Sequence, residues 1–380
     1  MAEDYYRERK EWSERKHRLL AAYLTPFVKI LGGAWRGIVY YVDGFSGPGI
    51  YEDGSIGSPV LAAQHATRLQ EEGKHYGLCC INIELGRRNY VNLELNTKAY
   101  SQVAQNYHGT FGQHIENVLE TIADYPALFF LDPFGVKGME WRHVEPVLHR
   151  KAPTDILLRF DSLTIARLAG SASSSARQAA AKTRRLTEVY GVDSPDEWIR
   201  EWRRGKTPQQ RGLNMLRLYL RCLRSGINTG TGSYAAAYSI RDLEGRHKYY
   251  IAFASRHPKA AVLMSNTVCE VEASYEQEVQ EYRERTTLQP TLPGMVPPKE
   301  EIFREKVRRV KDDLVQRFGG QTVSRLSLHA GLLGDWFGRI KSKHLTQALK
   351  ELEETGSVTR DGPRSKDATP FTFKRGPTVG

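Results

Sequence analysis

Three acidic residues, each at the end of an apolar run, are the side chains of this sequence best placed for chemistry. Asp43 ends the run GIVYYVD, Glu84 ends GLCCINIE and Asp132 ends ALFFLD. Runs this rich in β-branched and aromatic residues predict buried strands. The carboxyl ends of parallel strands meet at one edge of a sheet, where ligands bind. The sequence therefore predicts a site at that edge to which three carboxylates contribute.

The segment after Asp43, Gly44-Phe45-Ser46-Gly47-Pro48-Gly49, has little side-chain bulk. Its glycines allow a ligand to approach the main chain, whereas the phosphate-binding motifs GxxxxGK[ST] and GxGxxG are absent from the sequence. An acid, a Gly-x-Gly turn and a second acid on the next strand are typical of S-adenosylmethionine sites, where the second acid binds the ribose hydroxyls. A surface loop that only turns the chain is the alternative. The predicted cofactor contacts are Asp43, Phe45, Gly47, Gly49, Ser58 and Glu84.

The tetrad Asp132-Pro133-Phe134-Gly135 follows the fourth predicted strand. Methyltransferases acting on exocyclic base amines carry a DPPY-like tetrad there. Its Asp accepts an amine proton, its Pro rigidifies the turn and its aromatic ring stacks on the base. We predict these roles for Asp132, Pro133 and Phe134, with no general base if the amine attacks directly. The alternative is an Asp-capped β-turn. Phe134-Gly135 replaces the usual Pro-Tyr, which leaves the target atom open.

These motifs carry a family resemblance. The segments YVDGFSGPGIY, GSP, CINIE and FFLDPFGVKG resemble the three-Cys-motif partner (TcmP) proteins over most of residues 1–285. The resemblance implies a methyltransferase-like domain, a trailing winged helix and a three-Cys-motif protein as a possible partner. The chain is more distantly similar to ribosomal-RNA adenine-N6 methyltransferases. Lys16-His17 matches their Lys-His pair, which implies Lys16 at the cofactor site; a solvated helix face is the alternative.

Strands that alternate with helical segments predict the fold class. We expect a Rossmann-like class I methyltransferase sheet of seven strands, mostly parallel, with an antiparallel hairpin over 234–255. A helical, Arg-rich insertion is predicted at about 162–232. The predicted domains are a methyltransferase-like domain over 1–285, a Pro-rich linker over 286–299 and a winged helix-turn-helix domain over 300–380.

Positive charge is concentrated in two blocks of this 380-residue chain. Residues 159–225 carry 14 Lys/Arg against 6 Asp/Glu, and residues 299–380 carry 17 against 11, within a total net charge of +11. Segregated positive charge is what a polyanion selects, and it predicts nucleic acid as a partner of 162–225. A solubilising surface is the alternative explanation.

The C-terminal block shows the order helix, helix, helix, hairpin, which is typical of a winged helix. Its third helix carries side chains that can reach phosphates and base edges, namely Lys341, Lys343, His344, Gln347 and Lys350. Protein docking is the alternative role of such a module.

Composition limits the setting of the protein. No window approaches eighteen uninterrupted apolar residues, and the charged start MAEDYYRERKEWSERK lacks a signal-peptide core. The four cysteines form no CxxC or Cys/His cluster, so we expect no metal site. The prediction is a cytoplasmic protein without a membrane anchor.

The leading hypothesis is therefore an S-adenosylmethionine-dependent methyltransferase that acts on nucleic acid, at an exocyclic amine such as adenine N6. One alternative is a nucleic-acid-binding regulatory or defence protein that keeps the cofactor fold as a scaffold or sensor. Another is a base-modification partner of a radical enzyme.

Overall fold

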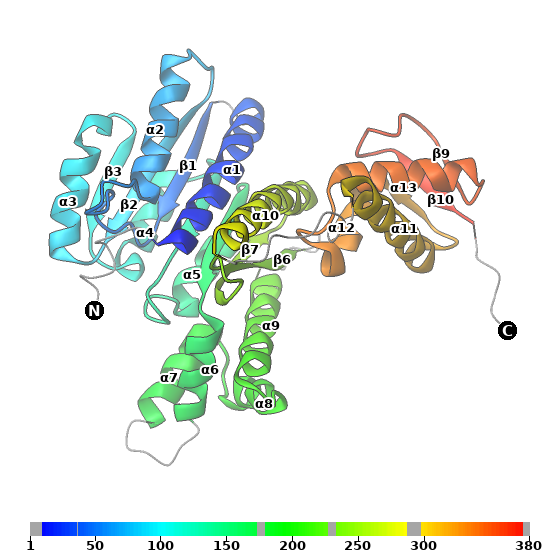
Figure 1. Cartoon of the computed structure of the whole chain (residues 1–380). Helices are drawn as coiled ribbons and strands as arrows, with labels where there is room; N and C mark the ends of the chain where they lie inside the picture. The colour runs from blue at the N-terminus through cyan, green and yellow to red at the C-terminus, as the bar shows by residue number, and fades with distance from the viewer. Residues whose placement is uncertain (1–9, 36, 173–178, 227–232, 287–297, 375–380) are drawn as a thin grey trace. The chain divides into compact units, whose positions relative to one another are not determined.

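The computed structural model describes residues 10–35, 37–172, 179–226, 233–286 and 298–374 (Figure 1). The chain separates into two compact units, Met1–His257 and Pro258–Gly380. The sequence placed the domain boundary after residue 285, whereas this division groups the long helix Pro258–Thr286 with the second unit. Most of the predicted linker, residues 287–297, lies outside the described residues.

The first unit alternates strands and helices. Its elements are α1 (Glu11–Ala34), β1 (Ile38–Asp43), α2 (Ser58–Glu71), β2 (Gly77–Glu84), α3 (Arg87–Thr97), a 3₁₀ turn (Lys98–Tyr100), β3 (Ala104–His108), α4 (Phe111–Ile122), β4 (Ala127–Leu131), α5 (Trp141–Leu148), β5 (Thr154–Phe160), α6 (Ser162–Ala172), α7 (Ala179–Tyr190), α8 (Asp196–Arg204), α9 (Pro208–Gly226), β6 (Tyr234–Arg241) and β7 (His247–Ser255).

The seven strands form one sheet in the order β3-β2-β1-β4-β5-β7-β6. Neighbouring strands from β3 to β5 are parallel, and β7 runs antiparallel to both β5 and β6. The predicted Rossmann-like class I methyltransferase sheet with its antiparallel hairpin is confirmed. Because β1, β2 and β4 are parallel neighbours, their ends lie at one edge, with Asp43 in register with Asn82 and Phe130.

Helices pack on both faces of the sheet because strand side chains alternate in direction. On one face, α4 to α9 share a core with alternate strand residues such as Ala252 and Ala254 of β7. On the other face, the ring of Phe253 lies 5.9 Å from that of Tyr23 in α1. Helix α4 shows the sequence logic: its buried residues recur every three or four positions, and Thr110 and Gln113 form a capping box at its start.

Three local boundaries differ from the sequence pattern, which predicts a helix over about 87–102, a weak strand near 106–111 and an N-cap at Ser58. The helix ends at Thr97, where the chain tightens into the 3₁₀ turn. Phe111 begins α4 because Thr110 caps that helix. Ser58 is the first residue of α2, and Gly57 holds the cap position. The described part of the insertion is helical, as predicted.

The second unit contains four helices and a small sheet among its described residues. Its elements are α10 (Pro258–Thr286), α11 (Lys299–Phe318), β8 (Thr322–Ser324), α12 (Arg325–Trp336), α13 (Ser342–Glu354), β9 (Val358–Arg360) and β10 (Pro370–Phe373). Strand β10 pairs antiparallel with both β8 and β9. The expected helices and hairpin are present, and β8 is an additional strand. None of the described helices is long and apolar enough to cross a membrane.

Candidate active site

Asp43 ends β1 and anchors the loop that leads to α2. Its carboxylate accepts hydrogen bonds from the Tyr41 hydroxyl (3.0 Å), from the backbone N–H of Phe45 (3.1 Å) and from the Ser58 hydroxyl. The side chain is fully buried. Burial raises the pKa of Asp43 to about 6, although these hydrogen bonds oppose the rise. Asp43 therefore holds the loop at its start, through Phe45, and at its end, through Ser58, while its own side chain is inaccessible to solvent.

The loop after Asp43 needs glycine at defined positions. Gly47 and Gly49 adopt φ angles of 64° and 81°, in the left-handed region that disfavours side chains. The N–H of Gly57 donates to the Gly49 carbonyl (2.7 Å), and a Cβ at Gly57 would lie 3.0 Å from that oxygen. The loop closes on itself through its main chain, which explains its lack of bulk.

Glu84, at the end of β2, ties this loop to the next one. One carboxylate oxygen accepts from the N–H of Gly47 (2.8 Å), and the other accepts from the N–H of Gly86 (2.6 Å). A carboxylate offers about four acceptor positions, so two backbone donors leave acceptor capacity on each oxygen. The residue is 8% exposed. Glu84 is thus positioned by the main chain and can still accept hydrogen bonds from a diol.

Asp132 follows β4 directly and lies between two cations. Lys16 of α1 forms an ion pair with one of its oxygens, and Nη1 of Arg159 in β5 lies 3.4 Å from the other. Burial favours a higher pKa for Asp132, but the Lys16 and Arg159 charges outweigh it and hold the pKa below its ordinary value. Asp132 is therefore ionised at neutral pH. Lys16 is only 3% exposed, so the alternative of a solvated helix face for Lys16 is wrong.

A cleft at this edge of the sheet brings most of the predicted residues together. Among its lining residues are the predicted Lys16, Phe45, Gly49, Ser58, Asp132 and Phe134. Phe134 is 45% exposed, whereas Pro133 is buried behind it. Asp43, Gly47, Pro133 and Glu84 do not line this cleft. Asp43 and Glu84 contact the loop that forms its wall instead.

Several residues of this region, among them His17, Tyr51 and Arg159, were not predicted as site residues. His17 and Tyr51 line the cleft, with their ring centroids 6.3 Å apart. Arg159 contacts Asp132, and its guanidinium lies over the ring of Tyr249 (4.3 Å). The signal for Arg159 was present in the sequence, because a single arginine interrupts the apolar strand TDILLRF.

The side chains predicted to bind nucleic acid on α13 and at its N-cap have internal partners. Lys341 lies 3.3 Å from a carboxylate oxygen of Glu270, and Lys350 lies 3.8 Å from one of Glu354. Gln347 donates to Glu351 (3.0 Å), and the Lys343 ammonium lies over the ring of Phe303 (5.2 Å).

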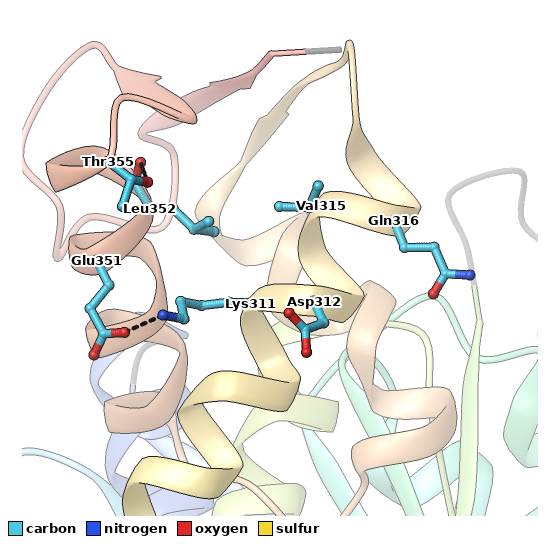
Figure 2. A pocket seen from close by; sticks show the side chains of 7 residues that line it. All are labelled: Lys311, Asp312, Val315, Gln316, Glu351, Leu352 and Thr355. Carbon is cyan, nitrogen blue, oxygen red and sulfur yellow. Dashed lines mark hydrogen bonds and ion pairs between the residues drawn. The ribbon is translucent and has the colours of Figure 1, made fainter. Parts of the chain in front are cut away.

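A groove between α11 and α13 is similarly neutralised (Figure 2). Its apolar floor includes Val315 and Leu352, and Lys311 at its side pairs with Glu351 (2.6 Å). The exposed surface of α13 is therefore mixed in charge rather than basic.

Comparison with known proteins gives fold-level likenesses only. The chain matches no family model and no curated protein. Among solved structures, it is similar to an O-methyltransferase from Bacillus cereus in complex with SAH (12% identity, 67% of this chain and 85% of that one, TM-score 0.36). It is also similar to the protein LPL1258 from Legionella pneumophila, assigned to DUF519 (11% identity, 68% and 89%, TM-score 0.35). A third likeness is to the O-methyltransferase TomG from Streptomyces achromogenes in complex with SAM (10% identity, 67% and 93%, TM-score 0.31). At such values, function has to be inferred from this chain's own residues.

Proposed function

We propose that the protein is an S-adenosylmethionine-dependent methyltransferase whose substrate is nucleic acid and whose target is an exocyclic base amine. The observation that carries the proposal is that three features lie at one edge of the sheet. They are a glycine-rich loop, a carboxylate that can accept hydrogen bonds from a diol, and an aromatic ring beside a second carboxylate. The loop follows β1, Glu84 ends β2, and Asp132 and Phe134 follow β4.

The residues at this edge fit the parts of S-adenosylmethionine. Glu84 has acceptor capacity for the two ribose hydroxyls. The Ser46 and Ser58 hydroxyls and the Lys16 ammonium line the cleft and suit the charged amino-acid end. Asp43 acts on the cofactor through the loop, because it holds Phe45 and Ser58 in place. The bound cofactor would supply an electrophilic methyl group.

Asp132 and Phe134 suit a flat base that carries an amine. The exposed ring of Phe134 is a stacking surface at the cleft. Asp132 is ionised and its contact with Arg159 is long, so one of its oxygens can accept a hydrogen bond from an amine N–H group. An ionised acceptor aimed at the N–H group favours transfer, since charge develops on that group as it reacts. The TcmP resemblance also suggests a three-Cys-motif protein as a partner.

A second candidate function follows from the same ion pairs. Both oxygens of Asp132 contact cations, an arrangement that also suits a structural link between α1, β4 and β5. In that case the protein is a nucleic-acid-binding regulator that senses the cofactor and transfers no methyl group. The observation that favours this function is the buried Lys16–Asp132 pair.

One experiment separates these functions. The full-length protein is incubated with methyl-labelled cofactor and total cellular DNA and RNA, and the nucleosides are analysed by mass spectrometry. A methylated base amine supports the enzyme. Cofactor binding in calorimetry without any labelled nucleoside supports the sensor, and no cofactor binding contradicts both.

Phe134 provides a sharper test of the target base. Phe134→Leu is expected to weaken the substrate interaction by about 1–3 kcal/mol, the range for one stacked base, while Phe134→Tyr retains it. Cofactor affinity is expected to be unchanged in both variants. Equal methylation by Phe134→Leu and the parent would contradict stacking on this ring.

A further inference from the structure

The helical insertion carries an exposed basic surface on its last two helices. Residues 196–226 contain eight Lys/Arg against three Asp/Glu. On α9, Arg217, Arg221 and Arg224 follow the four- and three-residue spacing that places side chains on one helix face. Six arginines of this surface are exposed: Arg200, Arg203, Arg204, Arg217, Arg221 and Arg224. We call these six the α8–α9 arginine surface.

Little of this charge is neutralised within the protein. Glu201 contacts Arg204 (3.0 Å) and Arg221 (2.7 Å), whose side chains are still 63% and 52% exposed. Across the described ranges, no other arginine of the surface lies within ion-pair distance of a carboxylate. Asp196 and Glu197, the other two acids, lie in the first turn of α8. One carboxylate thus serves two arginines. Arg224 donates its Nε–H to the Leu220 carbonyl (3.3 Å), and its terminal N–H groups, like the guanidinium groups of Arg200, Arg203 and Arg217, can donate to an external anion.

Three exposed arginines of α11 in the second unit differ in this respect. On α11, Arg304 pairs with Glu300, and both Arg308 and Arg309 pair with Glu305. Lys311 pairs with Glu351 across the groove shown in Figure 2. The arginines of the α8–α9 arginine surface are therefore less neutralised by carboxylates than those of α11.

The insertion begins at the same sheet edge as the cleft. Helix α6 starts two residues after β5 ends, and Figure 1 shows α6 to α8 projecting beyond the sheet. Arg159, near the end of β5, contacts Asp132 in the cleft. Phe160, the next residue, is in register with Tyr250, and Arg217 lies close enough to Tyr250 to oppose the burial-driven rise of its pKa. The arginine surface thus extends outward from the strand end that supports the cleft.

We propose that the α8–α9 arginine surface binds the phosphates of a single-stranded nucleic-acid segment next to the target base. This inference rests on the proposed function, of which it specifies the substrate. Planar guanidinium groups suit phosphate oxygens, to which they can donate in pairs. A base can reach Phe134 and Asp132 only when it is out of a base-paired stack, and a single strand meets that condition without unpairing.

Two triple variants of the full-length protein test the proposal. The test variant is Arg203→Gln, Arg217→Gln and Arg224→Gln, and the matched control is Arg304→Gln, Arg308→Gln and Arg309→Gln. Both remove three exposed positive charges, so a general effect of net charge would be the same in each. Binding of labelled single-stranded RNA and DNA and of duplex DNA is measured by fluorescence anisotropy over a salt series, without cofactor.

Log affinity falls as log salt rises, and each phosphate contact on a single strand contributes about 0.7 to the steepness of this fall. The test variant loses three contacts, so its slope is expected to be less steep than the parental slope by about 2. The control is expected to keep the parental slope. A third variant, Glu201→Gln, removes the carboxylate shared by Arg204 and Arg221, so it should bind more tightly than the parent. Thermal unfolding of all three variants verifies that they are folded.

Several results would overturn the proposal. Equal weakening by both triple variants would mean that net charge alone attracts nucleic acid, and greater weakening by the control would place the contact on the second unit. Tighter binding of duplex DNA than of either single strand would contradict the proposal that this surface binds a single-stranded segment. An absence of binding to any of the three nucleic acids would contradict it too. A failure of the proposed methyltransferase function can be distinguished from a failure of this binding proposal. In that case the anisotropy results would be as expected here, but no labelled methyl group would be transferred to nucleic acid.

Discussion

Asp132 illustrates how one carboxylate can serve both stability and chemistry. It lies between Lys16 and Arg159, both of which have little solvent exposure. A cation as buried as Lys16 is stable only with a partner, since an isolated charge in the interior has a large desolvation cost. Any substitution of Asp132 therefore affects the fold as well as the reaction, and the two effects have to be separated.

A double-mutant cycle separates them. Asp132→Asn is expected to lower the free energy of unfolding by about 3 kcal/mol or more, because Lys16 loses its carboxylate. The double variant Lys16→Met/Asp132→Asn should recover part of this loss in urea unfolding, since no buried charge is left unpaired. Cofactor affinity should stay nearly constant in Asp132→Asn.

Turnover provides the second half of that test. If Asp132 accepts a hydrogen bond from the amine, turnover should fall by roughly 10²-fold in Asp132→Asn and remain low in the more stable double variant. Parental methylation by Asp132→Asn would show that the tetrad is only a turn. A collapse of cofactor binding would instead assign Asp132 to the cofactor site.

The loop between β1 and α2 acts as a unit at the scale of secondary structure elements. Asp43 and Glu84 hold it through backbone N–H groups, and its glycines permit the left-handed turns that these contacts require. A positive φ disfavours any side chain, but only some of the glycines also face close neighbours. Gly49 and Gly54 have φ angles of 81° and 80°, and they differ in their surroundings.

This pair of glycines gives a matched test of the loop. A Cβ at Gly49 would lie 3.3 Å from both Leu93 and Val60, whereas one at Gly54 would meet nothing within 4 Å. Gly54→Ala is therefore expected to cost only the strain of a left-handed residue, about 1–2 kcal/mol. Gly49→Ala should cost more and should weaken cofactor binding by about tenfold, roughly 1.4 kcal/mol, in calorimetry. Equal cofactor affinity in the two variants would contradict the role of this loop.

At the scale of the whole first unit, two buried carboxyls, Asp43 and Asp155, have raised pKa values. Asp43 lies at the carboxyl edge of the sheet, and Asp155 lies near the start of β5. Asp155 accepts hydrogen bonds from the Tyr23 hydroxyl of α1 (2.6 Å) and from the Ser255 hydroxyl. Burial raises the pKa of each carboxyl from its ordinary 3.8 to about 6, against the effect of these hydrogen bonds.

The raised pKa values predict how stability depends on pH. The folded protein binds these protons more tightly than the unfolded chain, so the contribution is complete below pH 3.8 and is lost as pH rises through about 6. Asp155→Asn lacks this proton-binding contribution, so the variant should be less stable than the parent at about pH 4. The parent loses the contribution as the pH rises, so the difference in the free energy of unfolding should shrink by up to about 3 kcal/mol by about pH 7.5. Urea unfolding at both pH values measures it. A deficit that grows with pH would contradict the assigned shift.

The sequence by itself determined the strands, the sheet class and the residues at the strand ends. Apolar runs end at Asp43, Glu84 and Asp132, and a strand buried on both faces needs such a run whatever its neighbours are. Glycine spacing likewise indicated the bare loop, because few other residues adopt its φ angles.

Only the tertiary structure decided which of these groups meet and what charge each one carries. Lys16 and Asp132 are 116 residues apart, and their contact depends on how α1 packs over the sheet. The same holds for the burial of Asp43 beneath its loop and for Lys341 beside Glu270. Hydrophobic periodicity records which side of an element is buried, but not which distant element covers it. Ion pairs and pKa shifts depend on which distant element covers a buried side chain, so they follow from the packed chain rather than from the local sequence pattern.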